Sequence, residues 1–298
     1  MDFGFIKLRV GSADLLLLDG IGDGSGGKRE EVARAILHRR RGVGGLRLAS
    51  VARSEKDLWL EVYDRDGSRK AALFDAALCA ARWLLDSGRA GSEELHFRTA
   101  SGEILVDVLD GSSLGLSVGP LYGLPDRALL DGGLALERSL RVESKGERFE
   151  ALPVALSATG EAAGSDEAGG ARREGTARRE GPEGVVFFHE GVGAPLRVKL
   201  SSRGRGKVPA VAIPALCLSE AEIVIGAPKG ARVDTVSMAA MALGAAALLG
   251  RASDEAFVRS GRDGLWVRRE SDGSLYVAAR PAYVFRGDFP IDERTETV

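Results

Sequence analysis

The 298-residue sequence contains no asparagine and no glutamine. Because amide side chains both donate and accept hydrogen bonds, any site that needs such a group is excluded. Depletion of thermolabile amides is also typical of proteins adapted to heat. The first absence therefore predicts a thermophilic protein whose polar sites depend on carboxylates, hydroxyls and cations.

Cysteine and histidine are scarce as well. Cys79 and Cys217 both lie in apolar runs, which argues against a disulfide framework and a thiolate metal site and favours small core residues over nucleophiles. His38, His96 and His189 have neither metal-ligand spacing nor the pattern of a Ser-His-Asp set. We predict that the protein binds no metal.

The net charge of the chain is small, and its apolar runs are short. The chain has 41 basic and 43 acidic residues, so no global field attracts nucleic acid or an anionic membrane. Its apolar runs are shorter than the roughly 18 residues of a membrane span, and its start has no signal-peptide pattern. We expect a mature cytoplasmic protein with neither nucleic acid nor membrane as a partner.

The run VSMAAMALGAAALLG at 236 to 250 carries one hydroxyl and no charge. A helix that is apolar on every side must be buried on every side, either in a bilayer or inside a protein. The rest of the chain offers mainly short strands with alternating polarity, and a sheet of such strands can curl around the helix. We therefore favour enclosure by a sheet.

Internal similarity divides the chain into two units. The helical runs at 73 to 88 and 236 to 250 are each followed by three alternating strands with the same glycine-marked turns. Gly102 and Gly264 lie 162 positions apart, as do Gly111 and Gly273. The similarity predicts an α+β fold with two pseudo-symmetric domains, each a mostly antiparallel β-sheet rolled around a central apolar α-helix.

The predicted domains span 1–122 and 123–285, with a tail at 286–298 that returns to the N-terminal half. Residues 158–184 have few apolar side chains and repeat ARREG, which predicts a flexible insertion in the second domain. A nucleic-acid-binding arm is the alternative interpretation. It is disfavoured because glutamate alternates with arginine and aromatic residues are absent.

Several segments resemble the framework of the diaminopimelate epimerase family. The similarity covers FIKLRVGSADLLLLDG at 5–20, ARAILHRRRGVGG at 33–45, the Asp-Gly-Ser turn at 66–68, CAARWLLDSG at 79–88 and SLYVAARPAYVFRGDF at 274–289. The resemblance implies a cofactor-independent isomerase fold. In that family one cysteine thiol from each half moves a proton on each face of the substrate α-carbon, and both thiols sit at helix N-termini.

The two family signatures fall on 73–79 and 234–241, which places the catalytic cysteine positions at Leu73 and Met238. The amides with which the family grips its substrate are also missing: Ala13, Asp64, Ala194 and Leu196 stand at polar positions. Thiol-based epimerisation needs the whole assembly. The resemblance thus implies a divergent protein that lacks two-thiol epimerase activity, a pseudoenzyme of this family.

The remaining candidates are carboxylates and hydroxyls. Asp64, Asp75 and Asp234 are the catalytic candidates, since the related phenazine biosynthesis isomerase group uses a carboxylate as its proton shuttle. The candidate ligand-binding residues are Asp14, Asp64, Thr235 and Ser237. For Asp75 and Asp234, helix capping is the competing interpretation, and we favour it.

Two functions remain open. The first is a divergent epimerase-like protein, monomer or homodimer, that binds a small carboxylate or amino acid in the interdomain cleft. The second is an isomerase or epimerase that uses carboxylates in place of cysteines. We predict that Leu73, Phe74, Met238 and Met241 partly plug the cleft, which would favour the first.

Overall fold

A computed structural model gives the structure of the chain. It describes residues 2–18, 29–54, 57–70, 73–91, 93–123, 140–144, 147–157, 180–189, 211–226, 234–261 and 263–290. Ala194, Leu196 and most of the predicted insertion, 158–179, lie outside the described residues, whereas residues 180–184 belong to a strand.

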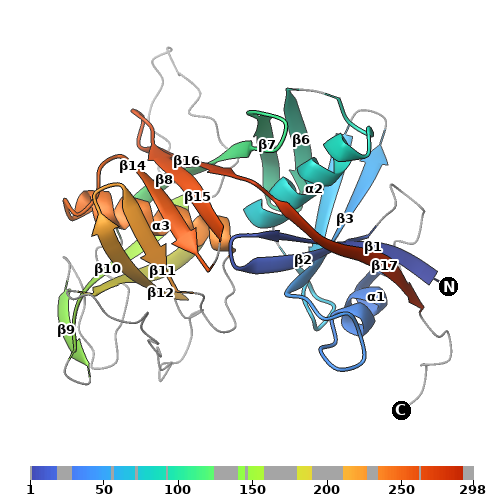
Figure 1. Ribbon diagram of the computed structural model, residues 1–298, viewed down its shortest axis with the longest axis horizontal. Helices are drawn as coiled ribbons and strands as arrows, with labels where there is room; N and C mark the ends of the chain where they lie inside the picture. Colours follow the sequence, from blue (N-terminus) through green and yellow to red (C-terminus); the bar gives the residue numbers. More distant parts are fainter. Residues whose placement is uncertain are drawn as a thin grey trace, which may run out of the picture.

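The described elements form two lobes, each with one central helix (Figure 1). The first contains β1 (Asp2–Val10), β2 (Ala13–Leu18), α1 (Arg29–Ile36), β3 (Arg47–Ser54), β4 (Asp57–Tyr63), β5 (Arg69–Lys70), α2 (Phe74–Asp86), β6 (Glu94–Thr99), β7 (Gly102–Val108) and β8 (Leu114–Gly123). The remaining elements are β9 (Leu140–Ser144), β10 (Glu147–Ser157), β11 (Glu180–His189), β12 (Val211–Ser219), β13 (Glu222–Ile225), α3 (Thr235–Leu248), β14 (Glu255–Ser260), β15 (Asp263–Arg269), β16 (Ser274–Ala279) and β17 (Ala282–Pro290).

Strands pair in the same order in both halves. In the first half, β1 to β4 pair antiparallel, parallel and antiparallel, β4 pairs parallel with β6, and β6, β7 and β8 continue antiparallel. The second half repeats this order with β10 to β13 and then β14, β15 and β16. In each half the central helix forms the crossover between two parallel strands. The predicted fold class is confirmed.

Both central helices are enclosed by their sheets. Every residue of α3 from Thr235 to Ala246 is buried, and so is every residue of α2 from Phe74 to Ala81. The surrounding strands alternate between buried and exposed residues, as β6 does throughout its length, because one face of each sheet packs on its helix. No helix among the described residues is long and apolar enough to cross a membrane.

Each half also gives a strand to the other. The beginning of β8 pairs with β7, whereas β16 pairs along β8 from Leu114 to Pro120 and β10 pairs with its end. In Figure 1 the dark red β17 runs across the molecule to the N-terminal lobe, where it pairs with β1 from Asp2↔Pro290 to Arg9↔Ala282. These exchanged strands tie the halves together.

Candidate functional site

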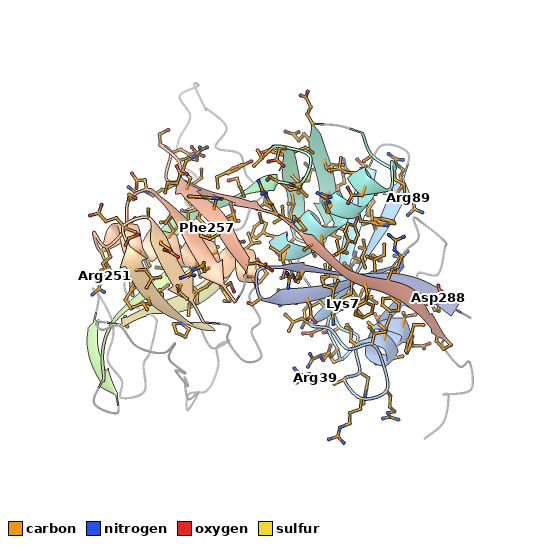
Figure 2. All side chains as sticks on the ribbon, in the orientation of Figure 1. Lys7, Arg39, Arg89, Arg251, Phe257 and Asp288 are labelled. Atoms are coloured by element: carbon orange, nitrogen blue, oxygen red, sulfur yellow. The ribbon has the colours of Figure 1, made fainter. Side chains whose placement is uncertain are left out.

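The two central helices point their N-terminal ends toward each other. Both helices end at a glycine with positive φ, Gly88 at 67° and Gly250 at 66°, which is the usual left-handed helix stop. Arg89 and Arg251, which follow these glycines, lie on opposite outer sides of the molecule in Figure 2. The helices contact each other, so their starts meet at the boundary between the halves.

A buried cluster of two acids and one base occupies this boundary. Asp75 lies in the first turn of α2, Asp234 immediately precedes α3, and Arg47 begins β3. Arg47 Nη1 lies 3.7 Å from Asp75 Oδ2, and the two side chains are only 5% and 4% exposed. Asp234 is 3% exposed. The cluster therefore places two carboxylates and one guanidinium in a site that water hardly reaches.

The two acids differ in their hydrogen bonds. Asp234 caps α3: its carboxylate accepts from the Ser237 backbone N–H at 2.8 Å and from the Ser237 hydroxyl at 2.7 Å. Asp75 does not cap α2, which starts after Leu73 without a side-chain cap, and Asp75 Oδ1 is buried without a hydrogen-bond partner. The capping interpretation is thus confirmed for Asp234 and wrong for Asp75.

Burial makes this cluster retain a proton. Burial first, and then the charge of Asp234, raise the pKa of Asp75 to about 7, while Arg47 opposes the shift. Burial likewise raises the pKa of Asp234, although the Ser237 hydrogen bonds and Arg47 lower it. Two carboxylates facing one guanidinium have one negative charge too many for a dry site, so the pair holds one proton below about pH 7 and loses it as the pH rises through that value.

A turn from the first half covers the start of α3. At Gly11, where φ is 56°, an added Cβ would lie 2.8 Å from Thr235 Cγ2. The Ser12 and Ser260 hydroxyls are hydrogen-bonded at 2.7 Å, and Arg9 Nε lies 3.1 Å from Asp263 Oδ2. The β1–β2 turn thus closes over the helix start and leaves no room for a side chain at Gly11.

Two other candidate acids lie elsewhere. Asp14 forms an ion pair with Lys7 at 2.7 Å, and Asp64 forms one with Lys70 at 3.6 Å. Their side chains are 43% and 41% exposed. The structure therefore brings Asp75, Asp234, Thr235 and Ser237 together at the helix starts and places Asp14 and Asp64 in surface ion pairs.

Sequence reasoning missed Arg47. A usable signal was present, because Arg47 shares its strand face with Ala49 and Val51, both in the core around α2. A cation that alternates with core residues needs a buried anion. No group of three or more His, Cys, Asp or Glu among the described residues could hold a metal ion.

Comparison with known proteins agrees with the topology. No protein-family model matches the sequence. A diaminopimelate epimerase from Moorella thermoacetica is 26% identical over 301 residues, with 97% of this chain and 99% of that protein covered. The chain is thus similar to a diaminopimelate epimerase over almost its whole length.

Solved structures show the same fold as this epimerase-like chain at low sequence identity. A phenazine biosynthesis protein of the PhzF family from Enterococcus faecalis matches with a TM-score of 0.61 and 11% identity, covering 98% of this chain and all of that one. A hydroxyproline epimerase from Agrobacterium vitis, solved with trans-4-hydroxy-L-proline, matches with a TM-score of 0.56 and 13% identity, covering 99% and 93%.

Apolar side chains fill the region where the resemblance places the family's thiols. Leu73 precedes the first residue of α2, and Met238 lies in the first turn of α3. Both are buried, as are their neighbours Phe74 and Met241. That these side chains plug the interdomain cleft stays a prediction.

The two cysteines of the epimerase-like chain lie away from the helix starts. Cys79 is inside α2, where burial, reinforced by the charge of Asp75, raises the pKa of its thiol well above the ordinary value. Cys217 lies on β12, and burial raises its thiol pKa as well. Since the thiolate is the reactive form, both residues behave as core side chains.

Proposed function

We propose that this epimerase-like protein has lost proton transfer by two thiols. In its place, the N-terminal ends of α2 and α3 form a closed site that holds the acids Asp75 and Asp234. The observation that supports the proposal is the burial of Leu73 and Met238, which stand where the resemblance places the family's thiols. Neither side chain can accept or deliver a proton. Of the two thiols that remain, Cys79 is buried and Cys217 is partly buried, and each has a raised pKa.

In this proposal, the acid cluster takes the place of a bound ligand. Arg47 and two helix N-termini favour an anion, so the site suits a small carboxylate or amino acid. Asp75 already places a carboxylate 3.7 Å from Arg47. We infer that this internal carboxylate occupies the position that a ligand carboxylate would take, and therefore that carboxylate ligands bind weakly to the wild-type protein.

Solvent exchange tests the loss of activity. The protein is incubated in D2O with diaminopimelate, proline and hydroxyproline, and loss of the α-proton signal is followed by NMR. We expect no exchange above the protein-free rate, whereas the Moorella thermoacetica enzyme serves as the positive control for diaminopimelate. Exchange that disappears in Cys79→Ala or Cys217→Ala would overturn the proposal, because it would show that a thiol still moves the proton.

A second function, isomerisation by carboxylates, is favoured by one observation. Burial and Asp234 raise the pKa of Asp75 to about 7, which suits a group that both takes and returns a proton near neutrality. Such a shuttle acts on a more activated carbon than that of a free amino acid. The test is a panel of unsaturated carboxylates in D2O, with turnover lost in Asp75→Asn and Asp234→Asn but retained in Cys79→Ala.

A further inference from the structure

The acid cluster is built from both halves of the molecule. Arg47 and Asp75 come from the first half, on β3 and α2, and Asp234 comes from the second half at the start of α3. All three residues are buried. Within the described part of the chain, the contact between the two helix starts thus brings together two acids and one base.

Few other charges act on this contact. Asp234 and Arg47 act on Asp75, Arg47 acts on Asp234, and Asp75 acts in turn on the Cys79 thiol. Among the described side chains, the strands packed on α2 and α3 turn mainly apolar groups toward the helices; the buried polar ones include Arg47 and the Thr99 and Ser260 hydroxyls. The nearby pair Arg9 and Asp263 is on the surface and is internally neutral.

We propose that the two helix starts form a proton-operated latch between the halves. With one proton shared by Asp75 and Asp234, the cluster is neutral and the helix starts stay in contact. When that proton leaves, two buried carboxylates face a single guanidinium. The helix starts then separate locally so that water can solvate the extra charge.

The remaining connections limit how far the halves can part. The β8–β16, β8–β10 and β1–β17 ladders cross between the halves, and their backbone hydrogen bonds involve no titratable group. Opening gives up the part-buried Ser12–Ser260 hydrogen bond, the packing of Gly11 on Thr235 and the Arg9–Asp263 pair. It also exposes part of the apolar packing of Leu73, Phe74, Met238 and Met241 to water. The uncompensated charge of the unprotonated acid pair has to outweigh these contacts, so the opening stays local.

Hydrogen exchange measured by mass spectrometry on the full chain tests the latch. Exchange is compared between about pH 5.5 and about pH 8.5 after correction for the intrinsic rate, and opening should increase up to about ten-fold per pH unit once the shared proton is lost. The increase is expected in peptides over 73–80 and 234–241 and is absent from 114–118 in β8. Asp75→Asn should abolish it, because no second carboxylate remains to repel Asp234.

Asp234→Asn provides the second variant, since asparagine is also a good N-cap and retains the helix start if Asp75→Asn does not fold. Asp263→Asn is the matched control: it removes a surface acid at the same boundary and should keep the pH response. The latch is overturned if wild-type exchange at the helix starts does not change with pH, if the change persists in both Asn variants, or if β8 opens equally. This readout needs no substrate, so it is independent of the activity tests above.

Discussion

The Tyr276 hydroxyl donates a 2.7 Å hydrogen bond to Asp107 Oδ2, joining β16 of the second half to β7 of the first. The tyrosine ring crosses Gly115 on β8, where an added Cβ would lie 2.0 Å from the hydroxyl oxygen and 2.5 Å from Cζ. Glycine at position 115 is therefore what allows the ring to reach Asp107. The packing of the two halves therefore depends on the absence of a Cβ at Gly115 as well as on the Tyr276–Asp107 hydrogen bond.

Gly115→Ala should destabilise the protein, because a rigid ring held by a hydrogen bond has to move. Overpacking of this kind costs about 1–3 kcal/mol. The measurement is the free energy of urea unfolding followed by circular dichroism. Gly111→Ala is the control, since a Cβ at Gly111 meets nothing within 4 Å and should leave stability within about 0.5 kcal/mol. Equal effects of the two substitutions would contradict the close approach of Tyr276 to Gly115.

The buried acid pair should make stability fall as pH rises. Because the folded-state pKa of Asp75 is raised to about 7, the folded protein binds a proton that the unfolded chain releases near pH 4. The stabilisation is complete below about pH 4 and is lost as pH rises through about 7, at no more than about 1.4 kcal/mol per pH unit for one proton. Other groups add their own slopes to the wild-type curve.

The test compares urea unfolding of the wild type and Asp75→Asn across this pH range, because the difference between them isolates the acid pair. The wild type should lose stability relative to the variant as pH rises. Asp14→Asn, which removes an exposed acid that pairs with Lys7, should follow the wild-type curve. A constant difference between wild type and Asp75→Asn would show that Asp75 titrates in the folded protein as it does in the unfolded chain.

Substitution of Asp234 should reveal how much a buried helix cap contributes to the free energy of unfolding. Asp234→Ala removes the acceptor of the Ser237 N–H and leaves the Ser237 hydroxyl without its partner, which should cost about 1–2 kcal/mol. Asp234→Asn keeps an acceptor and should recover most of that loss. The comparison uses the same unfolding measurement at a pH below 6, where the shared proton is retained. An Asn variant as unstable as the Ala variant would mean that charge and not capping is the main contribution of Asp234.

Features that depend on side-chain pattern were predictable from the sequence. The uninterrupted apolar run that became α3 could only be buried on all sides, and the alternation in β6 required one covered face. The partners of the carboxylates were harder to predict. Lys7 reaches Asp14 through the β1–β2 register, and Arg47 reaches Asp75 only after β3 packs on α2.

The capping error at Asp75 has a similar cause. Asp75 stands near the start of a helical pattern, but which residue becomes the N-cap depends on where the chain leaves the preceding loop, and sequence places helix ends only to within a few residues. Leu73 takes that position, so Asp75 falls inside the first turn and faces Arg47. A shift of two residues thus separates a capping acid from one that is buried beside a guanidinium.

Restoring the thiols should not restore the family's chemistry. In the double variant Leu73→Cys and Met238→Cys, a thiol stands at each helix start, where the N-terminal amides lower its pKa. The charges of Asp75 and Asp234 oppose that effect, since a thiolate beside buried carboxylates is a third negative charge against Arg47 alone. Substrate-binding amides are also absent from the whole sequence. We expect no α-proton exchange with diaminopimelate in D2O by NMR.

Adding Asp75→Asn to the double variant removes one carboxylate and supplies one amide. The triple variant should therefore be more reactive toward a disulfide reagent at neutral pH than the double variant, with Cys79→Ala included in both so that only the new thiols are measured. Diaminopimelate exchange by the double variant at a rate near that of the Moorella thermoacetica enzyme would show that the acid pair does not block the site, and both the loss of function and its electrostatic cause would then be wrong.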